Sequence, residues 1–419
     1  MRPRRSAHDR KRLLLASGLF ILAIGIAAVR AGFSMEAAGL RIGAAFLMHD
    51  FYTTAYYPAR AFLEGQSPYD AGYLPFAPTH LLVHLPFALL PPGAAGVAYF
   101  LFNVLLAVPL AYLVLRLVRL EPHPARVLAL AGAILLSRPG HWTLLVGQLS
   151  ILLSALAYAA FLYARSRPTL AGWALSVTLF KPTWGVPLAL LLWAWGRRKT
   201  AALGVALAAL VNLPLMAVLA AREGGLGQLI SAATSHYQDF DELVDPLMAK
   251  GRTDATSLIG RFLGAPLSTV GQVLLSAGIL LLSAAVLRLL ARHDTPAAGA
   301  LAIGIICLAT SLVGYHQGYD LVLLSAPFLA AALPGLSSGM PRGLRAVVLI
   351  LFSILAVNWI STESVIAALR PSPALSLVIT SVNGSCVAAL FLAYLALGLR
   401  YHVNAEGQSR SVGSGALAS

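Results

Sequence analysis

Residues 44–73 read AAFLMHDFYTTAYYPARAFLEGQSPYDAGY and form the first long polar interruption in a chain that is otherwise mostly apolar. An apolar run at residues 13–29 comes before it, and further apolar runs recur up to residue 399. The interruption carries Asp50, Glu64 and Asp70 among several aromatic residues. This pattern predicts a membrane protein in which the stretch is an external loop with short helices at the membrane surface.

The composition excludes a soluble globular domain. Of 419 residues, 58% are apolar and 11% charged, and the mean hydropathy is +0.79. We expect an all-α polytopic membrane protein with about 12 transmembrane helices. Residues 1–400 form one membrane domain, and the Gly- and Ser-containing tail at 401–419 is expected to lack regular structure. Cys307 and Cys386 lie in apolar runs and are interpreted as packing residues.

The net charge of +14 reflects topology and does not indicate a nucleic acid partner. With the basic segment RPRRSAHDRKR at residues 2–12 in the cytoplasm, as an uncleaved signal anchor, the loops alternate between the two sides. The cytoplasmic loops then hold 20 Lys and Arg against 4 Asp and Glu, and the external loops hold 10 against 12. Both termini are predicted to be cytoplasmic, with long external loops at residues 30–93 and 222–266.

Several apolar windows are shorter than the roughly 20 residues that a crossing helix needs. Residues 79–90 are followed by Pro91 and Pro92, and we interpret this window as a re-entrant or interfacial helix. The other short windows are expected to extend into their flanking residues.

This topology brings polar residues that are distant in sequence to the external side. They are Asp50, Asp70, His141, Gln148, Lys181, residues 237–245, Tyr315, His316 and Asp320. Ionisable groups are costly in hydrocarbon, so their gathering on one side indicates a functional site there.

Lys181 and the motif YHQGYD are the main candidates for substrate contacts in this set. Lys181 precedes a proline at a span end, where it either anchors the helix at the interface or binds a lipid phosphate. His316 and Asp320 are four residues apart and share a helical face, so with Tyr315 they are candidates for substrate binding. Tyr69 can stack on a sugar ring.

A metal site is less favoured by the sequence. His316 and Asp320 lack an identifiable third protein ligand. Asp239 and Asp241 resemble a D-x-D pattern, but an acidic run in an external loop is usually only solvated. The sequence therefore requires no cofactor and leaves a divalent metal open.

Four segments resemble glycosyltransferase family 87, membrane enzymes of the GT-C superfamily that are similar to polyprenyl-phosphate-mannose-dependent α-1,2-mannosyltransferases. The segments are HDFYTTAYYPARAFLEGQSPYD, FAPTHLLVHLPFALLPP, VGQLSILLSALAYAAFLYARSRPTLAGWALSVTLFKPTWGVPLALLLW and SLVGYHQGYDLVLLSAP. The resemblance covers residues 48–327 and implies a GT-C fold. The Gly-Gln pair, the Leu-rich span and the later Lys-Pro pair are its most specific part.

The resemblance also implies roles for individual residues. Asp50 would be the catalytic base, Gln148 and Lys181 would border the donor pocket, and His316 would match the histidine of the late external motif. The chain departs from the family pattern at Thr54 and at residues 76–78, where tyrosine and Tyr-Pro-Pro are frequent. Both departures lie in the first external loop, so they concern the identity of the acceptor and of the sugar more than the chemistry.

The implied activity is transfer of a hexose from a polyprenyl-phosphate donor to a hydroxyl of a glycolipid or glycan. Mannose is the expected hexose. Asp50 would take the hydroxyl proton in an inverting reaction, while Lys181, with Arg60 or Arg138, would hold the phosphate. The expected location is a bacterial inner membrane with the active site on the periplasmic side. A lipid or solute transporter, and a transferase of the same fold for another sugar such as arabinofuranose, are the alternatives.

Overall fold

The computed structural model describes residues 7–37, 48–73, 76–243, 245, 249–337 and 340–415. These residues are helical or irregular, and none of them belongs to a β-strand. One isolated bridge pairs Arg252 with Gln317. The predicted all-α class is therefore confirmed.

The first half of the chain contains α1 (Ala7–Ala37), α2 (His49–Phe51), the π-helical η1 (Tyr52–Tyr56), α3 (Tyr57–Leu63), α4 (Thr79–Ala88), α5 (Pro92–Leu117), α6 (Pro124–Leu136), α7 (Arg138–Val146), α8 (Ser150–Tyr163), α9 (Pro168–Thr178), α10 (Pro182–Ala194) and α11 (Arg198–Arg222). The second half contains α12 (Leu226–Leu243), α13 (Ala255–Leu263), α14 (Thr269–Leu290), α15 (Pro296–Leu312), the 3-10 helix η2 (Gly318–Leu324), α16 (Ser325–Ala332), α17 (Arg342–Val357), η3 (Trp359–Ser361), α18 (Glu363–Leu369) and α19 (Pro373–Gly415). Many of these helices begin at proline, whose fixed φ suits the first helical position.

Five helices of the described chain are long and apolar enough to cross a membrane, so the predicted count of about 12 spans is not confirmed. They are Lys11–Val29, Pro92–Leu117, Arg198–Arg222, Thr269–Leu290 and Pro373–Glu406. Other apolar helices have only 10–17 residues. At 1.5 Å per residue, a helix of 13 residues is about 20 Å long, less than the roughly 30 Å of the hydrocarbon core.

The expected extension of the short windows into flanking residues does not occur around Lys181. Helix α9 ends at Thr178 and α10 begins at Pro182, so the chain turns inside the protein. Phe180 and Lys181 in this turn are buried, and the carbonyl of Phe180 accepts a hydrogen bond from the N–H of Ala77 at 2.9 Å. Irregular backbone at membrane depth is tolerated where the protein satisfies its polar groups.

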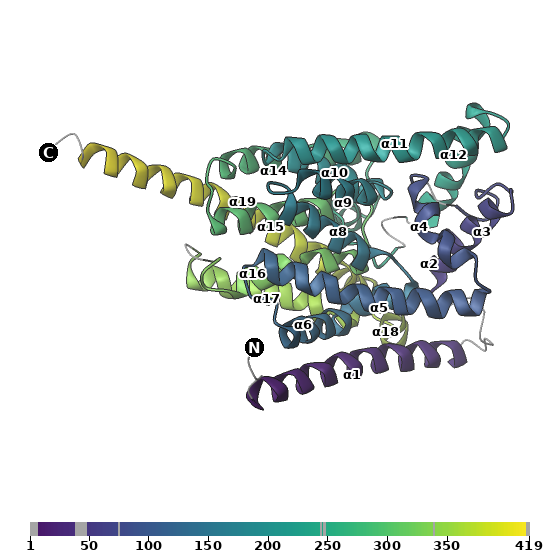
Figure 1. The fold of residues 1–419 in the computed structure, drawn as a ribbon, viewed down its shortest axis with the longest axis horizontal. Helices are drawn as coiled ribbons and strands as arrows, with labels where there is room; N and C mark the ends of the chain where they lie inside the picture. Colours follow the sequence, from purple (N-terminus) through teal and green to yellow (C-terminus); the bar gives the residue numbers. More distant parts are fainter. Residues whose placement is uncertain are drawn as a thin grey trace, which may run out of the picture.

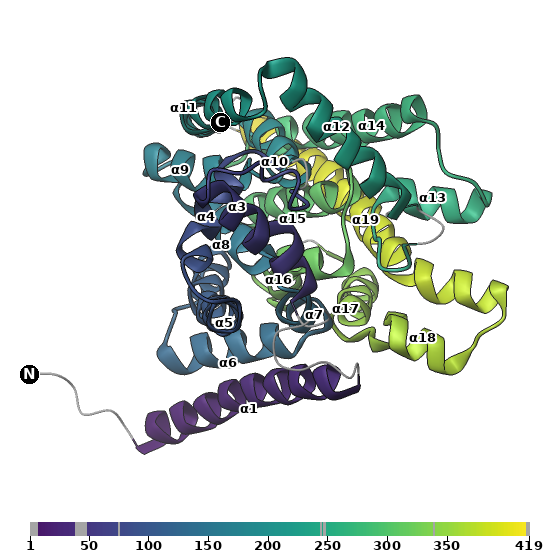
Figure 2. The same ribbon diagram turned by 90° about the vertical axis from the view of Figure 1, so that its right-hand side faces the viewer.

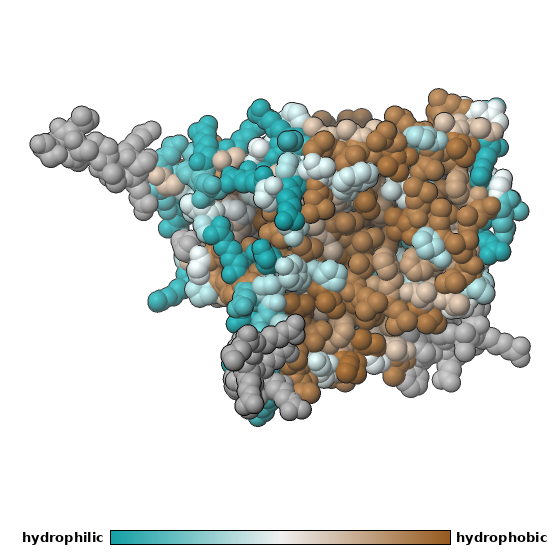
Figure 3. Space-filling model, viewed as in Figure 1, coloured by the Kyte–Doolittle hydropathy of each residue, from teal (hydrophilic) through white to brown (hydrophobic). Residues whose placement is uncertain are grey.

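The two ends of the molecule are distinct. Helices α1, α5 and α11 run along the long axis, the start of α1 and the end of α19 lie at one end, and α2, α3, α4 and α12 lie at the other (Figure 1). Seen from that second end, α3, α4 and α12 are in front of the bundle (Figure 2). The visible surface is hydrophobic between two hydrophilic ends, as expected of a protein that crosses a membrane (Figure 3).

The polar loops contain more helix than the sequence indicated. Helices α12 and α13 lie within the predicted second external loop, and α4 is a ten-residue helix, too short to cross alone. A small hydrophobic cluster that includes Tyr69, Tyr73, Leu81 and Leu229 packs the first polar loop against α11 and α12.

The predictions for the C-terminal tail and for the two cysteines had opposite outcomes. Helix α19 continues to Gly415, so the prediction that the chain after Arg400 lacks regular structure is wrong up to that residue. No proline follows Arg400, and Ala405 and Glu406 favour helix, so nothing local ends α19 at the membrane surface. Cys307 and Cys386 are buried and unlinked, as predicted.

The end that carries α2 and α3 is predicted to face outward. In intact cells, Gln66→Cys should react with a membrane-impermeant maleimide, and Lys199→Cys should react only after permeabilisation. Both native side chains are exposed, so accessibility of the positions is matched. The reverse labelling pattern would invert the predicted topology.

Candidate active site

A large cavity lies at the end of the molecule that carries α2 and α3. Its volume is about 1430 Å³, above the roughly 300–1,000 Å³ of most small-molecule sites. Its wall combines segments that are far apart in sequence, and its polar lining includes His49, Asp50, Thr54, Tyr57, Gln148, Lys181, Asp245, Arg252, Thr256, Tyr315, Gln317 and Tyr319. The cavity can therefore hold parts of two substrates at once.

Asp50 is the central residue of the short helix α2. The chain enters α2 through Met48, which has a left-handed backbone with φ 58°, and the Met48 N–H donates to the carbonyl of Leu145 at 2.6 Å. Nε2 of Gln148 donates to Oδ2 of Asp50, also at 2.6 Å. The backbone bond to α7 positions α2, and the bond from Gln148 fixes the Asp50 carboxylate at the cavity wall.

Gly147 allows this close approach between α2 and the turn that joins α7 to α8. Its φ is 76°, and a Cβ there would lie 2.6 Å from Cβ of Phe51 and 3.1 Å from Cβ of Met48. Any larger residue would separate Gln148 from Asp50. The Gly-Gln pair is therefore a structural unit: the glycine brings the turn close, and the glutamine binds the carboxylate.

An aromatic layer lies beneath α2. The ring of Phe51 stacks on Tyr99 at 4.1 Å, and the rings of His80 and His84 lie 4.4 Å apart. Burial lowers the pKa of His84 to about 4, so this histidine is neutral at physiological pH. His84 consequently supplies no positive charge to Asp50.

Burial raises the pKa of the Asp50 carboxyl above its ordinary value of 3.8. The hydrogen bond from Gln148 and the charges of His49 and Lys181 act in the opposite direction, and the charge of Asp320 adds to the rise. The net direction is upward because desolvation of the carboxylate is the largest effect. A carboxylate with a raised pKa is a stronger base than one in water.

Lys181 lies in the wall of the same cavity and is held by Asp320. Its Nζ is 3.1 Å from Oδ1 and 3.2 Å from Oδ2 of Asp320, and both side chains are almost fully buried. Ser150 donates to Oδ1 of the same carboxylate at 2.7 Å. This arrangement fixes the ammonium group at the cavity, with its counterion behind it.

His316 completes the shell around Asp320. Its Nδ1 lies 3.0 Å from Oδ2 of Asp320, and its Nε2 lies 3.2 Å from the carbonyl oxygen of Thr183. Both ring nitrogens therefore lie next to hydrogen-bond acceptors. His316 and Asp320 are fully buried and absent from the cavity lining, which favours a positioning role for them over the substrate contact expected from the sequence.

Arg252 is a second buried cation at the cavity, and the sequence reasoning missed it. Its Nε and Nη2 bind the two carboxylate oxygens of Asp254 at 2.9 and 3.0 Å, and its guanidinium carbon lies 5.1 Å from the ring centre of Tyr315. Burial alone would raise the pKa of Asp254, but the charge and hydrogen bonds of Arg252 outweigh it and the pKa is lowered. The only sequence signal was an external arginine two residues before an aspartate.

Backbone hydrogen bonds join the Arg252 segment to the YHQGYD motif. The N–H of Thr253 donates to the carbonyl of His316 at 2.9 Å, and the N–H of Gly318 donates to the carbonyl of Gly251 at 3.0 Å. The two segments are more than 60 residues apart in sequence, yet they form one wall. Tyr315, a predicted substrate-binding residue, lines the cavity from this wall.

Three other candidates lie away from the cavity lining. Arg60 is exposed and pairs with Glu64, which directly follows the end of α3. Tyr69 packs in the hydrophobic cluster of the first polar loop. Arg138 is buried, with its guanidinium carbon 4.1 Å from the ring centre of Trp142. The structure thus brings Asp50, Gln148, Lys181 and Tyr315 together and leaves these three out.

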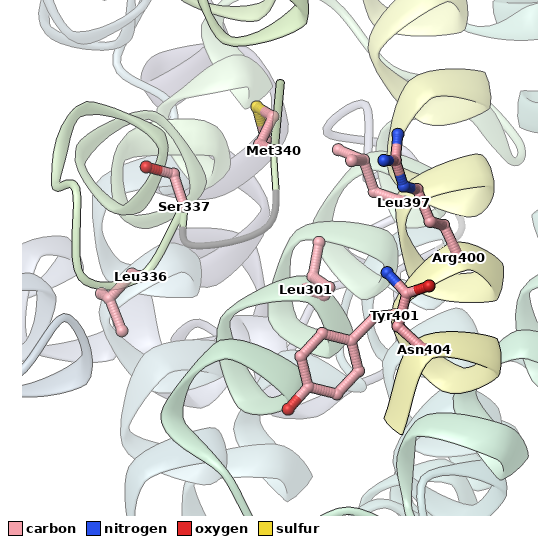
Figure 4. A pocket seen from close by; sticks show the side chains of 8 residues that line it. All are labelled: Leu301, Leu336, Ser337, Met340, Leu397, Arg400, Tyr401 and Asn404. Carbon is pink, nitrogen blue, oxygen red and sulfur yellow. The ribbon is translucent and has the colours of Figure 1, made fainter. Parts of the chain in front are cut away.

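Within the part of the chain that the structure describes, no three His, Cys, Asp or Glu residues lie together as a metal-binding group. The D-x-D pattern of Asp239 and Asp241 belongs to α12, but its side chains lie outside the described residues. A second, much smaller pocket lies between α15 and α19 and includes Leu301, Tyr401 and Asn404 (Figure 4). It contains no catalytic pair of side chains.

Residues 73–313 match the family model of glycosyltransferase family 87. The chain belongs to this family. No curated protein and no solved structure matches it. Membership in family 87 makes the protein a membrane glycosyltransferase, and the predicted family is confirmed. The matched region includes Gln148, Lys181 and Arg252. Asp50 and the YHQGYD motif lie outside it, and they are assigned to the site because Asp50 and Tyr315 line the cavity.

Replacing Gly147 should disturb the family 87 site through backbone strain and steric conflict. We expect Gly147→Ala to lower the free energy of unfolding by about 1–3 kcal/mol, because the new methyl group collides with Phe51 and φ is positive. Thermal unfolding of the purified protein measures this. Gly264→Ala is the matched control, since Gly264 has φ 68° but no atom within 4 Å of its added Cβ. Equal destabilisation of both variants would show that the close approach at Gly147 contributes nothing.

Proposed function

We propose that this glycosyltransferase moves a hexose, mannose, from a polyprenyl-phosphate donor to a hydroxyl group of a glycolipid or glycan acceptor. The reaction takes place on the non-cytoplasmic side of a bacterial inner membrane. The observation that carries the proposal is the single cavity lined by a carboxylate with a raised pKa, Asp50, and two buried cations, Lys181 and Arg252.

The reaction exchanges one bond at the anomeric carbon for another. The acceptor oxygen bonds to this carbon while the bond from the carbon to the phosphate oxygen breaks, and the electron pair leaves with polyprenyl phosphate. The hydroxyl proton passes to the Asp50 carboxylate. Attack opposite to the leaving group inverts the configuration, and a positioned base of this kind contributes about 100- to 10,000-fold to the rate.

Lys181 and Arg252 bind the phosphate of the donor and stabilise the charge that develops on it. Each cation has an aspartate partner, Asp320 or Asp254, so each is held in place before the donor arrives. Charges that are already fixed in position need no reorganisation during the reaction. Arg252 takes the part that the sequence analysis gave to Arg60 or Arg138.

A single carboxylate suffices for this chemistry. Phosphate leaves as a stable anion, so the leaving group requires no general acid. Glycoside hydrolases expel an alcohol and therefore use a second carboxyl group to protonate it. Asp320 and Asp254 are engaged by cations, which leaves Asp50 as the base among these three aspartates.

The direct test is incubation of the purified protein with a panel of polyprenyl-phosphate sugars and lipid acceptors, followed by mass measurement of the products. We expect a product one hexose heavier than the acceptor, with mannose as the first donor to test. Transfer only from nucleotide-linked sugars would overturn the donor assignment.

Asp50→Asn should lower turnover about 100-fold or more, because the amide cannot accept the hydroxyl proton. The variant should still be produced and inserted in the membrane. Asp70→Asn is the control, since Asp70 is an exposed carboxylate on the same loop. Turnover close to wild type in Asp50→Asn would remove Asp50 from the mechanism.

The pH dependence of kcat/KM tests Asp50 in a second way. The base acts when ionised, so activity should fall as the pH drops through the pKa of Asp50, which burial places above 3.8. Gln148→Leu removes a hydrogen bond that lowers this pKa, so its acidic limb should move to higher pH. Thr54→Ala loses only a bond to the Asp50 backbone carbonyl and should leave the limb in place. If the acidic limb of Gln148→Leu did not move, the group that titrates in the pH profile would not be Asp50.

A further inference from the structure

A small pocket adjoins the large cavity beside Gln148 and Lys181. Its volume is about 10 Å³, close to the smallest space that holds one water molecule or one hydroxyl group. Thr54, Phe76, Gln148 and Lys181 line both the pocket and the cavity, so the pocket is a recess in the cavity wall. We call it the His80 pocket, after the residue of α4 that lines it.

Backbone hydrogen bonds fix His80 next to the turn that carries Lys181. The N–H of Ala77 donates to the carbonyl of Phe180 at 2.9 Å, and the N–H of His80 donates to the carbonyl of Ala77 at the same distance. The centre of the His80 ring lies 4.4 Å from that of Phe76 and 5.3 Å from that of Phe180. These aromatic contacts restrict the orientation of the imidazole, so the pocket is formed before a substrate binds.

His80 brings an unused hydrogen-bonding atom to this pocket. The residue is only 4% exposed, and in the part of the chain that the structure describes its Nδ1 has no hydrogen-bond partner. His84, one helical turn later, differs because its Nδ1 donates to the carbonyl of His80 at 2.8 Å. A buried polar atom without a partner costs free energy, so a ligand group that pairs with Nδ1 of His80 is favoured.

Three other polar side chains at the pocket already have protein partners. The hydroxyl of Thr54 donates to the backbone carbonyl of Asp50 at 2.6 Å, and the amide of Gln148 donates to the carboxylate of Asp50. Lys181 is held by its aspartate partner. His80 is therefore the side chain of this pocket that is best suited to select a ligand group.

The chemistry of His80 indicates a hydroxyl group as its ligand. Burial lowers the pKa of His80 well below its ordinary value of 6.5, so the ring is neutral. A neutral imidazole has one donor and one acceptor nitrogen, and a hydroxyl group can serve either one. Pairing with a hydroxyl therefore does not depend on which nitrogen of His80 carries the proton.

The size of the pocket selects the part of a sugar that can enter it. A space of about 10 Å³ excludes a sugar ring and admits one small substituent. In a hexopyranose the hydroxyl at C6 is carried on a carbon atom outside the ring, so it reaches further into a recess than a hydroxyl on the ring itself. In the proposed reaction the anomeric carbon lies near Asp50 and the phosphate near Lys181. The recess between Lys181 and Gln148, the partner of Asp50, is therefore within reach of C6.

We propose that the His80 pocket binds the hydroxymethyl group of the transferred hexose, with Nδ1 of His80 hydrogen-bonded to the hydroxyl at C6. This inference rests on the proposed function for the class of donor. His80 is then a specificity-determining residue, which distinguishes a hexose from a pentose and from a 6-deoxy sugar.

The kinetic test compares three undecaprenyl-phosphate donors that differ only at C6. They are the D-mannosyl donor, its 6-deoxy analogue (D-rhamnosyl) and the D-lyxopyranosyl donor, which lacks C6. Wild-type kcat/KM should be about ten-fold or more lower for the two analogues, because each leaves the buried nitrogen of His80 unpaired. His80→Leu and His80→Phe both remove this nitrogen and should make the three donors nearly equal. His80→Phe keeps an aromatic ring beside Phe76, so the comparison can still be made if His80→Leu does not fold.

His141→Leu is the matched control for these variants. His141 is also a buried histidine, but it lines neither the His80 pocket nor the cavity. This variant should keep the wild-type preference for the D-mannosyl donor. An unchanged preference in both His80 variants would overturn the proposal. Equal rates with the three donors in the wild type would also overturn it, since the pocket would then hold only water.

A binding test does not depend on sugar transfer. In the absence of an acceptor, the D-mannosyl donor should raise the unfolding temperature of the purified wild type more than the D-rhamnosyl donor does, because tighter binding stabilises the folded state more. This difference should disappear in His80→Leu and His80→Phe. Each shift is measured against the same variant without donor, so a lower stability of the variant does not affect the comparison. Equal shifts with both donors in the wild type would contradict the proposal.

Together, the two tests distinguish failure of this inference from failure of the proposed function. A larger thermal shift with the D-mannosyl donor that the His80 variants abolish, without transfer from any polyprenyl-phosphate sugar, would support the pocket and refute the reaction. Transfer with the same donor preference in the wild type and in the His80 variants would support the reaction and refute the pocket.

Discussion

The buried pair of Lys181 and Asp320 is the interaction on which the site depends. Two charges in an apolar bundle are stable only when they are close together and their remaining hydrogen-bonding groups are satisfied. Ser150 and His316 meet that requirement at Asp320, and Lys181 binds both of its oxygens. Removing one member of such a pair typically costs about 3–5 kcal/mol, since the other charge stays buried. The pair therefore ties α8, the turn between α9 and α10, and η2 into one unit.

Asp50, Asp254 and Asp320 differ in their partners, and this difference separates their proposed roles. Asp320 is paired with Lys181, and Asp254 is paired with Arg252. Asp50 is bound by the neutral amide of Gln148. Burial therefore raises the pKa of Asp50, whereas Arg252 keeps that of Asp254 low. Similar burial thus produces two carboxylates that hold cations and one carboxylate with a raised pKa, the proposed base.

The sequence could predict those site residues whose position follows from topology or from the family resemblance. Asp50, Gln148, Lys181 and Tyr315 were found because each stands at the external end of an apolar run or in a recognisable motif. Arg252 was missed, since its approach to the site depends on backbone pairing between segments distant in sequence.

Some errors could have been avoided with local rules. Arg60 has a glutamate four residues later, at the end of its helix, a spacing that predicts the exposed pair seen in the structure. The count of about 12 spans is not confirmed, because several of the apolar windows form helices of only 10–17 residues. Pro182 indicates that α9 is not extended past Lys181, because proline begins a new helix there and the chain turns within the protein.

The buried turn that carries Lys181 and the proposed base, Asp50, share one environment. Had α9 continued to the membrane surface, Lys181 would lie at the lipid headgroups, where water weakens its interaction with a phosphate. The early turn places the ammonium group inside the protein, in the same cavity as Asp50. The burial that strengthens the interactions of the ammonium group also destabilises the Asp50 carboxylate, and the bond from Gln148 limits that effect. For the proposed reaction, a more polar cavity would weaken phosphate binding, and loss of the bond from Gln148 would raise the pKa of Asp50 further, so the glutamine adjusts one environment to both requirements.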